Sequence, residues 1–142
     1  MKKDDLIGTW LLVSFELRQD DGGIVYPFGK DVAGRITYAS TGHFSAQVMQ
    51  KNRPLFKSDD QMKGSIDEVM DNFKGVISYF GFYSVEDNIV THHVEESLFP
   101  NWKGLAMKRF AKLENGSLEL STEPTTWKGT NSIGMLIWEK SE

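Results

Sequence analysis

The segment from His92 to Glu95 carries the side chains of this sequence that are best suited to acid–base chemistry. Neighbouring side chains of a strand point to opposite faces, so His93 and Glu95 share one face while His92 lies on the other with Val90 and Val94. A glutamate two residues along a strand lies about 7 Å from the histidine, close enough for both to contact one substrate or one water. His92, His93 and Glu95 are therefore the candidate catalytic residues.

The sequence leaves open which of these two histidines faces the interior. The apolar neighbours of His92 favour it as the inward residue, whereas the nearby carboxylate favours His93 as the functional one. A β-bulge would exchange the faces. In a purely structural alternative, one histidine forms hydrogen bonds in a half-buried layer and the other is solvated. With three histidines and no cysteine, we expect neither a metal site nor a cofactor.

Aromatic and polar side chains elsewhere are candidates for a small-molecule site. Tyr79 and Tyr83 alternate with Phe80 and Phe82, and we favour the tyrosines on the inner face, because rings with hydroxyl groups suit a small-molecule pocket. An inward Gln47 could orient a carbonyl or a hydroxyl group. Packing alone accounts equally well for the tyrosines, and strand glutamines are more often exposed. The expected ligand contacts are Tyr38, Gln47, Tyr79, Tyr83, His93, Glu95 and Trp102.

The elements that must position these residues are strands. Short apolar and aromatic runs, separated by Gly, Asn and Asp, recur about every ten residues, which predicts an antiparallel β-meander. The pair Asn115-Gly116 is the clearest turn, because both residues accept the positive φ angles of a type I′ hairpin. We expect the last strand to pair with the first. The predicted strands are 9–17, 34–39, 44–49, 76–85, 89–98, 107–113, 117–121 and 134–140.

One helix is predicted between Ser65 and Gly75. Ser65 and Glu68 form a capping box, four apolar residues recur at helical spacing, and Gly75 is suited to the C-terminal cap. The apolar stripe must be buried, so we expect this helix to pack over the sheet or to close one end of a barrel.

Composition limits the protein to a narrow class. The 142 residues fit one domain, 1–142, with 39% hydrophobic and 25% charged residues, as in soluble globular proteins. A net charge of −4 without a basic stripe argues against nucleic-acid binding, and no apolar run approaches the ~20 residues of a membrane span. Because the first residues show no signal-peptide pattern, we expect a cytoplasmic protein. It could form a homodimer, since the sequence does not decide the oligomeric state.

Several motifs resemble those of a known family. The opening Gly8-Thr9-Trp10 is similar to the Gly-x-Trp strand of lipocalin and calycin barrels. Together with 26–29, 34–38, 91–95 and 100–102, it resembles a bacterial and fungal family of small stand-alone lipocalin-like domain proteins. The resemblance implies a mainly β fold: an up-and-down antiparallel barrel of about eight strands, one short helix and an internal cavity. It also implies that Trp10 closes the barrel bottom beneath Arg109 or Lys140.

Three functions are compatible with this pattern. The first is the binding of a small hydrophobic ligand in the barrel lumen, with no turnover. The second is a cyclase- or isomerase-type enzyme of secondary metabolism that uses a His/Glu pair in the lumen. The third is a protein-interaction barrel that uses its aromatic rims, which a lumen filled by side chains would favour.

Overall fold

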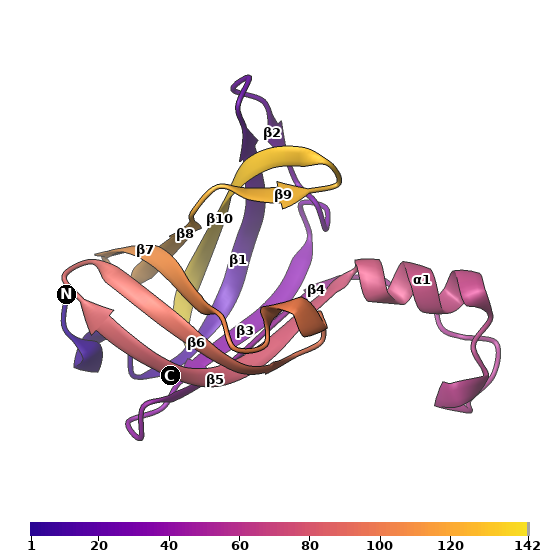
Figure 1. The fold of residues 1–142 in the computed structure, drawn as a ribbon, viewed down its shortest axis with the longest axis horizontal. Coiled ribbons are helices and arrows are strands. Elements are labelled where there is room, and N and C mark those ends of the chain that lie inside the picture. The colour runs from indigo at the N-terminus through magenta and orange to yellow at the C-terminus, as the bar shows by residue number, and fades with distance from the viewer. Residues whose placement is uncertain (142) are drawn as a thin grey trace.

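The structure, a computed structural model, describes residues 1–141 as a closed antiparallel β-barrel of eight strands (Figure 1). Each barrel strand pairs with the next one in the ring, and the last strand pairs with the first along most of its length, which closes the barrel. The barrel strands are β1 (Gly8–Gln19), β3 (Val32–Tyr38), β4 (His43–Gln50), β5 (Val76–Glu86), β6 (Ile89–Ser97), β7 (Ala106–Glu114), β8 (Ser117–Thr122) and β10 (Thr130–Ser141).

All eight predicted strands are confirmed, with ends that move by at most four residues. The turn at Asn115-Gly116 has positive φ angles of 52° and 79°, as its sequence predicts. Two short strands, β2 (Ile24–Val25) and β9 (Thr125–Trp127), were not predicted. Each pairs with one end of a long barrel strand, β2 with β1 and β9 with β10, and runs of two or three residues are too short to show a period.

Trp10 closes one end of the barrel. Its indole Nε1 donates a hydrogen bond to the Leu6 carbonyl at 2.8 Å, just after the 3-10 helix η1 (Lys3–Asp5). The Lys140 ammonium lies 5.0 Å from the centroid of the Trp10 ring and donates to the Ile7 carbonyl at 2.6 Å. The lysine therefore covers the tryptophan, as the resemblance implied for one of two basic residues, while Arg109 lies on the cavity wall.

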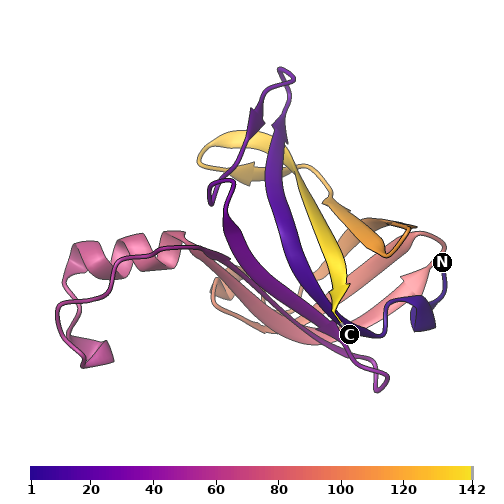
Figure 2. The same cartoon turned by 180° about the vertical axis from the view of Figure 1, so that it is seen from behind.

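The segment between β4 and β5, residues 51–75, forms an arm that leaves the barrel (Figures 1 and 2). It contains the 3-10 helix η2 (Gln61–Lys63) and α1 (Ile66–Lys74). The predicted capping box is confirmed, since Ser65 and Glu68 exchange hydrogen bonds of 3.2 and 2.9 Å, and Gly75 is the C-cap. No helix within residues 1–141 is both long enough and apolar enough to cross a membrane.

The expectation that this helix packs over the sheet or closes the barrel is wrong. None of its residues is buried, and the helix extends away from the barrel (Figure 1). The reason lies at its base, where β4 and β5 stay paired up to the hydrogen bond from Gln50 N to the Gly75 carbonyl, 2.8 Å long. The helix therefore begins beyond the end of the hairpin, where no barrel wall lies beside it.

Candidate ligand-binding site

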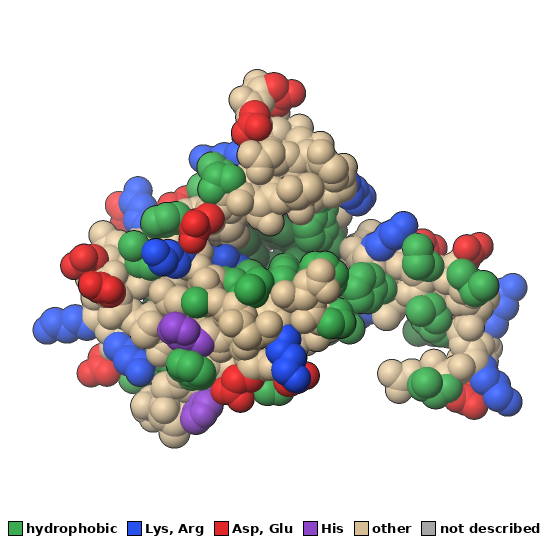
Figure 3. Space-filling model, in the orientation of Figure 1, with side chains coloured by type: hydrophobic (Ala, Val, Ile, Leu, Met, Phe, Trp, Pro, Cys, Tyr) green, Lys and Arg blue, Asp and Glu red, His purple; other side chains and the backbone are tan. Residues whose placement is uncertain are grey.

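The barrel contains a cavity of about 400 Å³. Its wall is mostly apolar and aromatic, because residues of alternate positions on the barrel strands face inward. Figure 3 shows it as a hollow bordered by hydrophobic side chains, between β9 and the 3-10 helix η3 (Pro100–Trp102). The deeper apolar wall comprises Phe15, Leu17, Ile36, Ala46, Val48, Leu120, Leu136 and Trp138.

Aromatic side chains frame the mouth of this cavity. Trp102 of η3 packs edge-on against Tyr79, with ring centroids 5.3 Å apart. On the opposite side, Trp127 of β9 packs against Phe15 and the buried Phe28. Phe28 thus belongs to the core, whereas Trp102 and Trp127 are half-buried and line the cavity.

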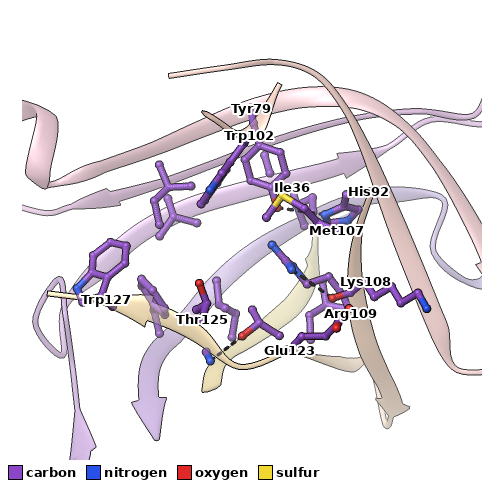
Figure 4. A pocket seen from close by; sticks show the side chains of 18 of the residues that line it. Ile36, Tyr79, His92, Trp102, Met107, Lys108, Arg109, Glu123, Thr125 and Trp127 are labelled. Atoms are coloured by element: carbon purple, nitrogen blue, oxygen red, sulfur yellow. Dashed lines mark hydrogen bonds between the residues drawn. The ribbon is translucent and has the colours of Figure 1, made fainter. Parts of the chain in front are cut away.

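The inner polar group of the cavity is His92 (Figure 4). Its side chain is 1% exposed and its ring stacks on Phe44 at 4.3 Å. Both ring nitrogens are hydrogen-bonded: Nε2 to the Tyr38 hydroxyl at 2.6 Å and Nδ1 to the Tyr79 hydroxyl at 3.1 Å. The sequence predicted Tyr38 and Tyr79 as ligand contacts and His92 as a catalytic candidate, but not that the three form one chain of hydrogen bonds from three strands.

Burial controls the charge of this network. It lowers the pKa of His92 well below its ordinary value, and the nearby Arg109 cation lowers that pKa further. Burial also raises the pKa of Tyr38 well above its ordinary value. Both side chains are therefore neutral near pH 7, and Arg109 supplies the positive charge on this part of the cavity wall.

The bulge in β6 decides the orientation of the histidines. The register between β5 and β6 shifts after the pair Gly81–Val94, so Glu95 is the extra residue and both histidines precede the bulge. His92 consequently faces inward with Val90 and Val94. A side chain at Gly81 would overlap the His93 carbonyl, which explains why the residue opposite the bulge is glycine.

His93 and Glu95 lie outside the cavity, so the prediction that they contact a ligand in the lumen is wrong. His93 stacks on Phe82 at 4.6 Å on the outer face and pairs with the Ser84 hydroxyl at 3.1 Å, while Glu95 is exposed. An enzyme that uses a His93/Glu95 pair in the lumen does not fit this structure, because neither side chain lines the cavity.

The remaining predicted contacts divide between the interior and the surface. Tyr79 and Trp102 line the cavity. Tyr38 and Tyr83 are buried but lie beyond the cavity wall, with ring centroids 4.8 Å apart, and the Tyr83 hydroxyl donates to the Ala39 carbonyl. Gln47 was predicted to face inward, and this prediction is wrong. Its side chain points outward and donates to Ser45 Oγ at 3.0 Å.

Sequence reasoning missed three polar features of the cavity. Arg109 faces inward from β7. It lies two residues before the buried Ala111 and so on the same face of the strand, which was the available signal in the sequence. The indole nitrogens of Trp127 and Trp138 are buried and have no hydrogen-bond partner within residues 1–141. Glu123, directly after β8, lies at the edge of the cavity. Among these same residues, no cluster of three or more potential metal ligands is present.

Comparison with known proteins agrees with the geometry. Residues 7–141 match the lipocalin-like domain family. The chain is 30% identical, over 105 residues, to the 4'-hydroxy-3'-methoxypropiophenone carrier protein of Aspergillus oryzae, a match that covers 68% of this chain and 95% of that relative. No solved structure matches the chain. The closed eight-stranded barrel and the match across nearly the whole sequence show that the chain belongs to the lipocalin-like domain family.

Proposed function

We propose that this protein binds a small aromatic molecule in the barrel cavity and acts as its carrier. The observation that carries this proposal is the cavity itself, about 400 Å³ in volume, with an apolar wall and a few polar groups at its inner end. Small-molecule sites have this construction, with volumes of roughly 300 to 1,000 Å³.

The aromatic composition of the wall supports an aromatic ligand. Rings of Phe15, Tyr79, Trp102, Trp127 and Trp138 contribute to the cavity surface. Such rings pack edge-on or offset against another ring, which gives flat ligands more contact than flexible chains of equal size. The relative from Aspergillus oryzae is named as the carrier of such a flat molecule, a substituted phenyl ketone.

Binding is tested first by native mass spectrometry of the freshly purified protein, compared with its denatured mass. We expect a stoichiometric adduct. The purified protein is then titrated calorimetrically with 4'-hydroxy-3'-methoxypropiophenone, the compound in the relative's name. Saturable binding with no change in the compound, checked by chromatography, supports a carrier, whereas conversion of the compound would indicate an enzyme.

A matched pair of variants locates the site. Ile77 lines the cavity, and Phe80 of the same strand is 48% exposed on the outer face. We expect Ile77→Trp to fill part of the cavity and weaken binding at least about tenfold. Phe80→Trp should leave binding unchanged. Equal affinities for the two variants, both folded by circular dichroism, would contradict binding in this cavity.

A further inference from the structure

The polar groups of the cavity limit what its ligand can be, and this inference rests on the proposed function. Three side chains of the cavity wall carry hydrogen-bond donors that the described residues do not fully use: the Tyr79 hydroxyl, the Arg109 guanidinium and the Trp138 indole N–H. We propose that the ligand carries an acidic oxygen on an aromatic framework, a phenol or a carboxylic acid, and that these three donors hold it as an anion.

The direction of the buried hydrogen-bond chain follows from the number of its partners. Tyr38 is fully buried, and its hydroxyl has a single partner within residues 1–141, Nε2 of His92. If that hydroxyl accepted from Nε2, its own proton would have no acceptor in the interior, which is costly. Tyr38 therefore donates to Nε2, and the proton of the neutral imidazole is on Nδ1.

The chain then ends on Tyr79. With its proton on Nδ1, His92 donates to the Tyr79 oxygen at 3.1 Å. The Tyr79 hydroxyl accepts this bond, and its own proton remains available to a ligand in the cavity that Tyr79 lines. Donors linked in this way polarise one another, so Tyr79 becomes a stronger donor than an isolated tyrosine.

Arg109 adds a charge that the described residues do not neutralise. It is half-buried on the cavity wall next to His92 (Figure 4). One guanidinium nitrogen donates to the Lys108 carbonyl at 3.2 Å, and within residues 1–141 no carboxylate forms an ion pair with it. A half-buried guanidinium with free donors favours an oxyanion, which it can bind with two parallel hydrogen bonds.

Trp138 supplies an independent sign of a missing acceptor. Its side chain is 2% exposed and lines the cavity, and its Nε1 has no partner in the described part of the chain. An indole N–H can only donate, so a ligand oxygen would satisfy it. The exposed Glu123 at the cavity edge is the single lining carboxylate, against the cations of Lys108 and Arg109, so the wall has a positive balance.

The experiment uses two matched probe pairs and measures affinity by titration calorimetry. The phenol pair is 4'-hydroxy-3'-methoxypropiophenone and its methyl ether, 3',4'-dimethoxypropiophenone. The carboxylic acid pair is 3,4-dimethoxybenzoic acid and its methyl ester. We expect at least one acid to bind about ten- to a hundredfold more tightly than its blocked partner, and the pair that shows this preference identifies the acid.

Variants assign the preference to the donors. Arg109→Gln should reduce the preference to about twofold or less, while Arg18→Gln, which changes an exposed arginine on the outer side of β1, should keep it. Tyr79→Phe and Trp138→Phe should each weaken the binding of the acid more than the binding of its blocked partner. Imidazole nitrogen NMR should show His92 protonated on Nδ1, and protonation on Nε2 would overturn the direction of the chain.

The outcomes separate this inference from the proposed function. Blocked probes that bind as tightly as the acids would overturn the inference and leave the carrier function intact. A preference that survives Arg109→Gln would also overturn it, because the cation would then not recognise the acid. Failure of all four probes to bind would overturn the proposed function for aromatic ligands, and the inference with it.

Discussion

The barrel interior and the arm are built from equally regular amphipathic patterns, yet only the barrel buries its apolar face. Inward residues such as Val90 and Leu118 are 0% exposed, because each barrel strand has a neighbour on both sides and the ring encloses them. The stripe of α1, which consists of Ile66, Val69, Met70 and Phe73, is between 45% and 82% exposed. Periodicity thus predicts an element and its apolar face, whereas topology decides what that face contacts.

The difference is expected to be largest in the free energy of unfolding. Leu118→Ala removes a fully buried side chain from the closed ring and should destabilise the protein by about 2 to 5 kcal/mol. Met70→Ala, on a residue that is 48% exposed in the arm, should change stability by no more than about 0.5 kcal/mol. Urea unfolding followed by far-UV circular dichroism compares the two. Similar losses for both variants would show that the arm is packed in solution.

The second difference concerns protonation, because the barrel buries a histidine and the arm has none. Burial lowers the pKa of His92 well below its ordinary value of 6.5, so at and below about pH 6.5 the unfolded chain binds a proton that the folded chain does not. Stability should therefore decrease as the pH falls through this range, by up to about 1.4 kcal/mol per pH unit from this group.

Thermal melts at pH 7.5 and at pH 5.0 measure this effect against two variants. His92→Gln should remove the contribution of the buried histidine, so its melting temperature should depend less on pH than that of the wild type. His43→Gln changes an exposed histidine and should keep the wild-type dependence. An unchanged pH dependence in His92→Gln would mean that His92 is not the group that titrates.

The comparison also shows which features of the protein could be predicted from its sequence. The eight barrel strands, the turn at Asn115-Gly116 and the helix cap at Ser65 depend on neighbouring residues, and all were predicted. The face of His92 was left open, because it depends on where β6 inserts its extra residue opposite Gly81. That position is set by contacts between strands rather than by the local pattern.

The candidate site was harder to predict for the same reason. Its apolar character and Tyr79 follow from alternation, but the meeting of Tyr38, Tyr79 and His92 requires three strands in register. Arg109 and Trp138 look like ordinary strand residues in the sequence. Only the closed ring shows that they share one cavity with the histidine.

A smaller effect should separate local from global stability within the arm. Ser65 accepts a hydrogen bond from Glu68 N, and its loss in Ser65→Ala should weaken the helix by about 1 kcal/mol. Amide hydrogen exchange of residues 69–74 should then accelerate about fivefold, while exchange in the barrel strands and the melting temperature stay unchanged. Faster amide exchange in the barrel strands or a melting temperature lowered by several degrees would show that arm and barrel are coupled.

The smallest effect is expected from removing the arm altogether. The ends of β4 and β5 already meet at the hydrogen bond between Gln50 and Gly75, so Asn-Gly in place of residues 51–74 would join them by a two-residue hairpin. Because the arm residues contribute no side chain to the cavity, this variant should bind the aromatic probes used above with an affinity within about twofold of the wild type. Its stability should change by less than about 1 kcal/mol, since no core contact is lost. Calorimetric titration and urea unfolding measure both quantities, and a large loss of affinity with an intact fold would mean that the arm reaches the ligand during binding.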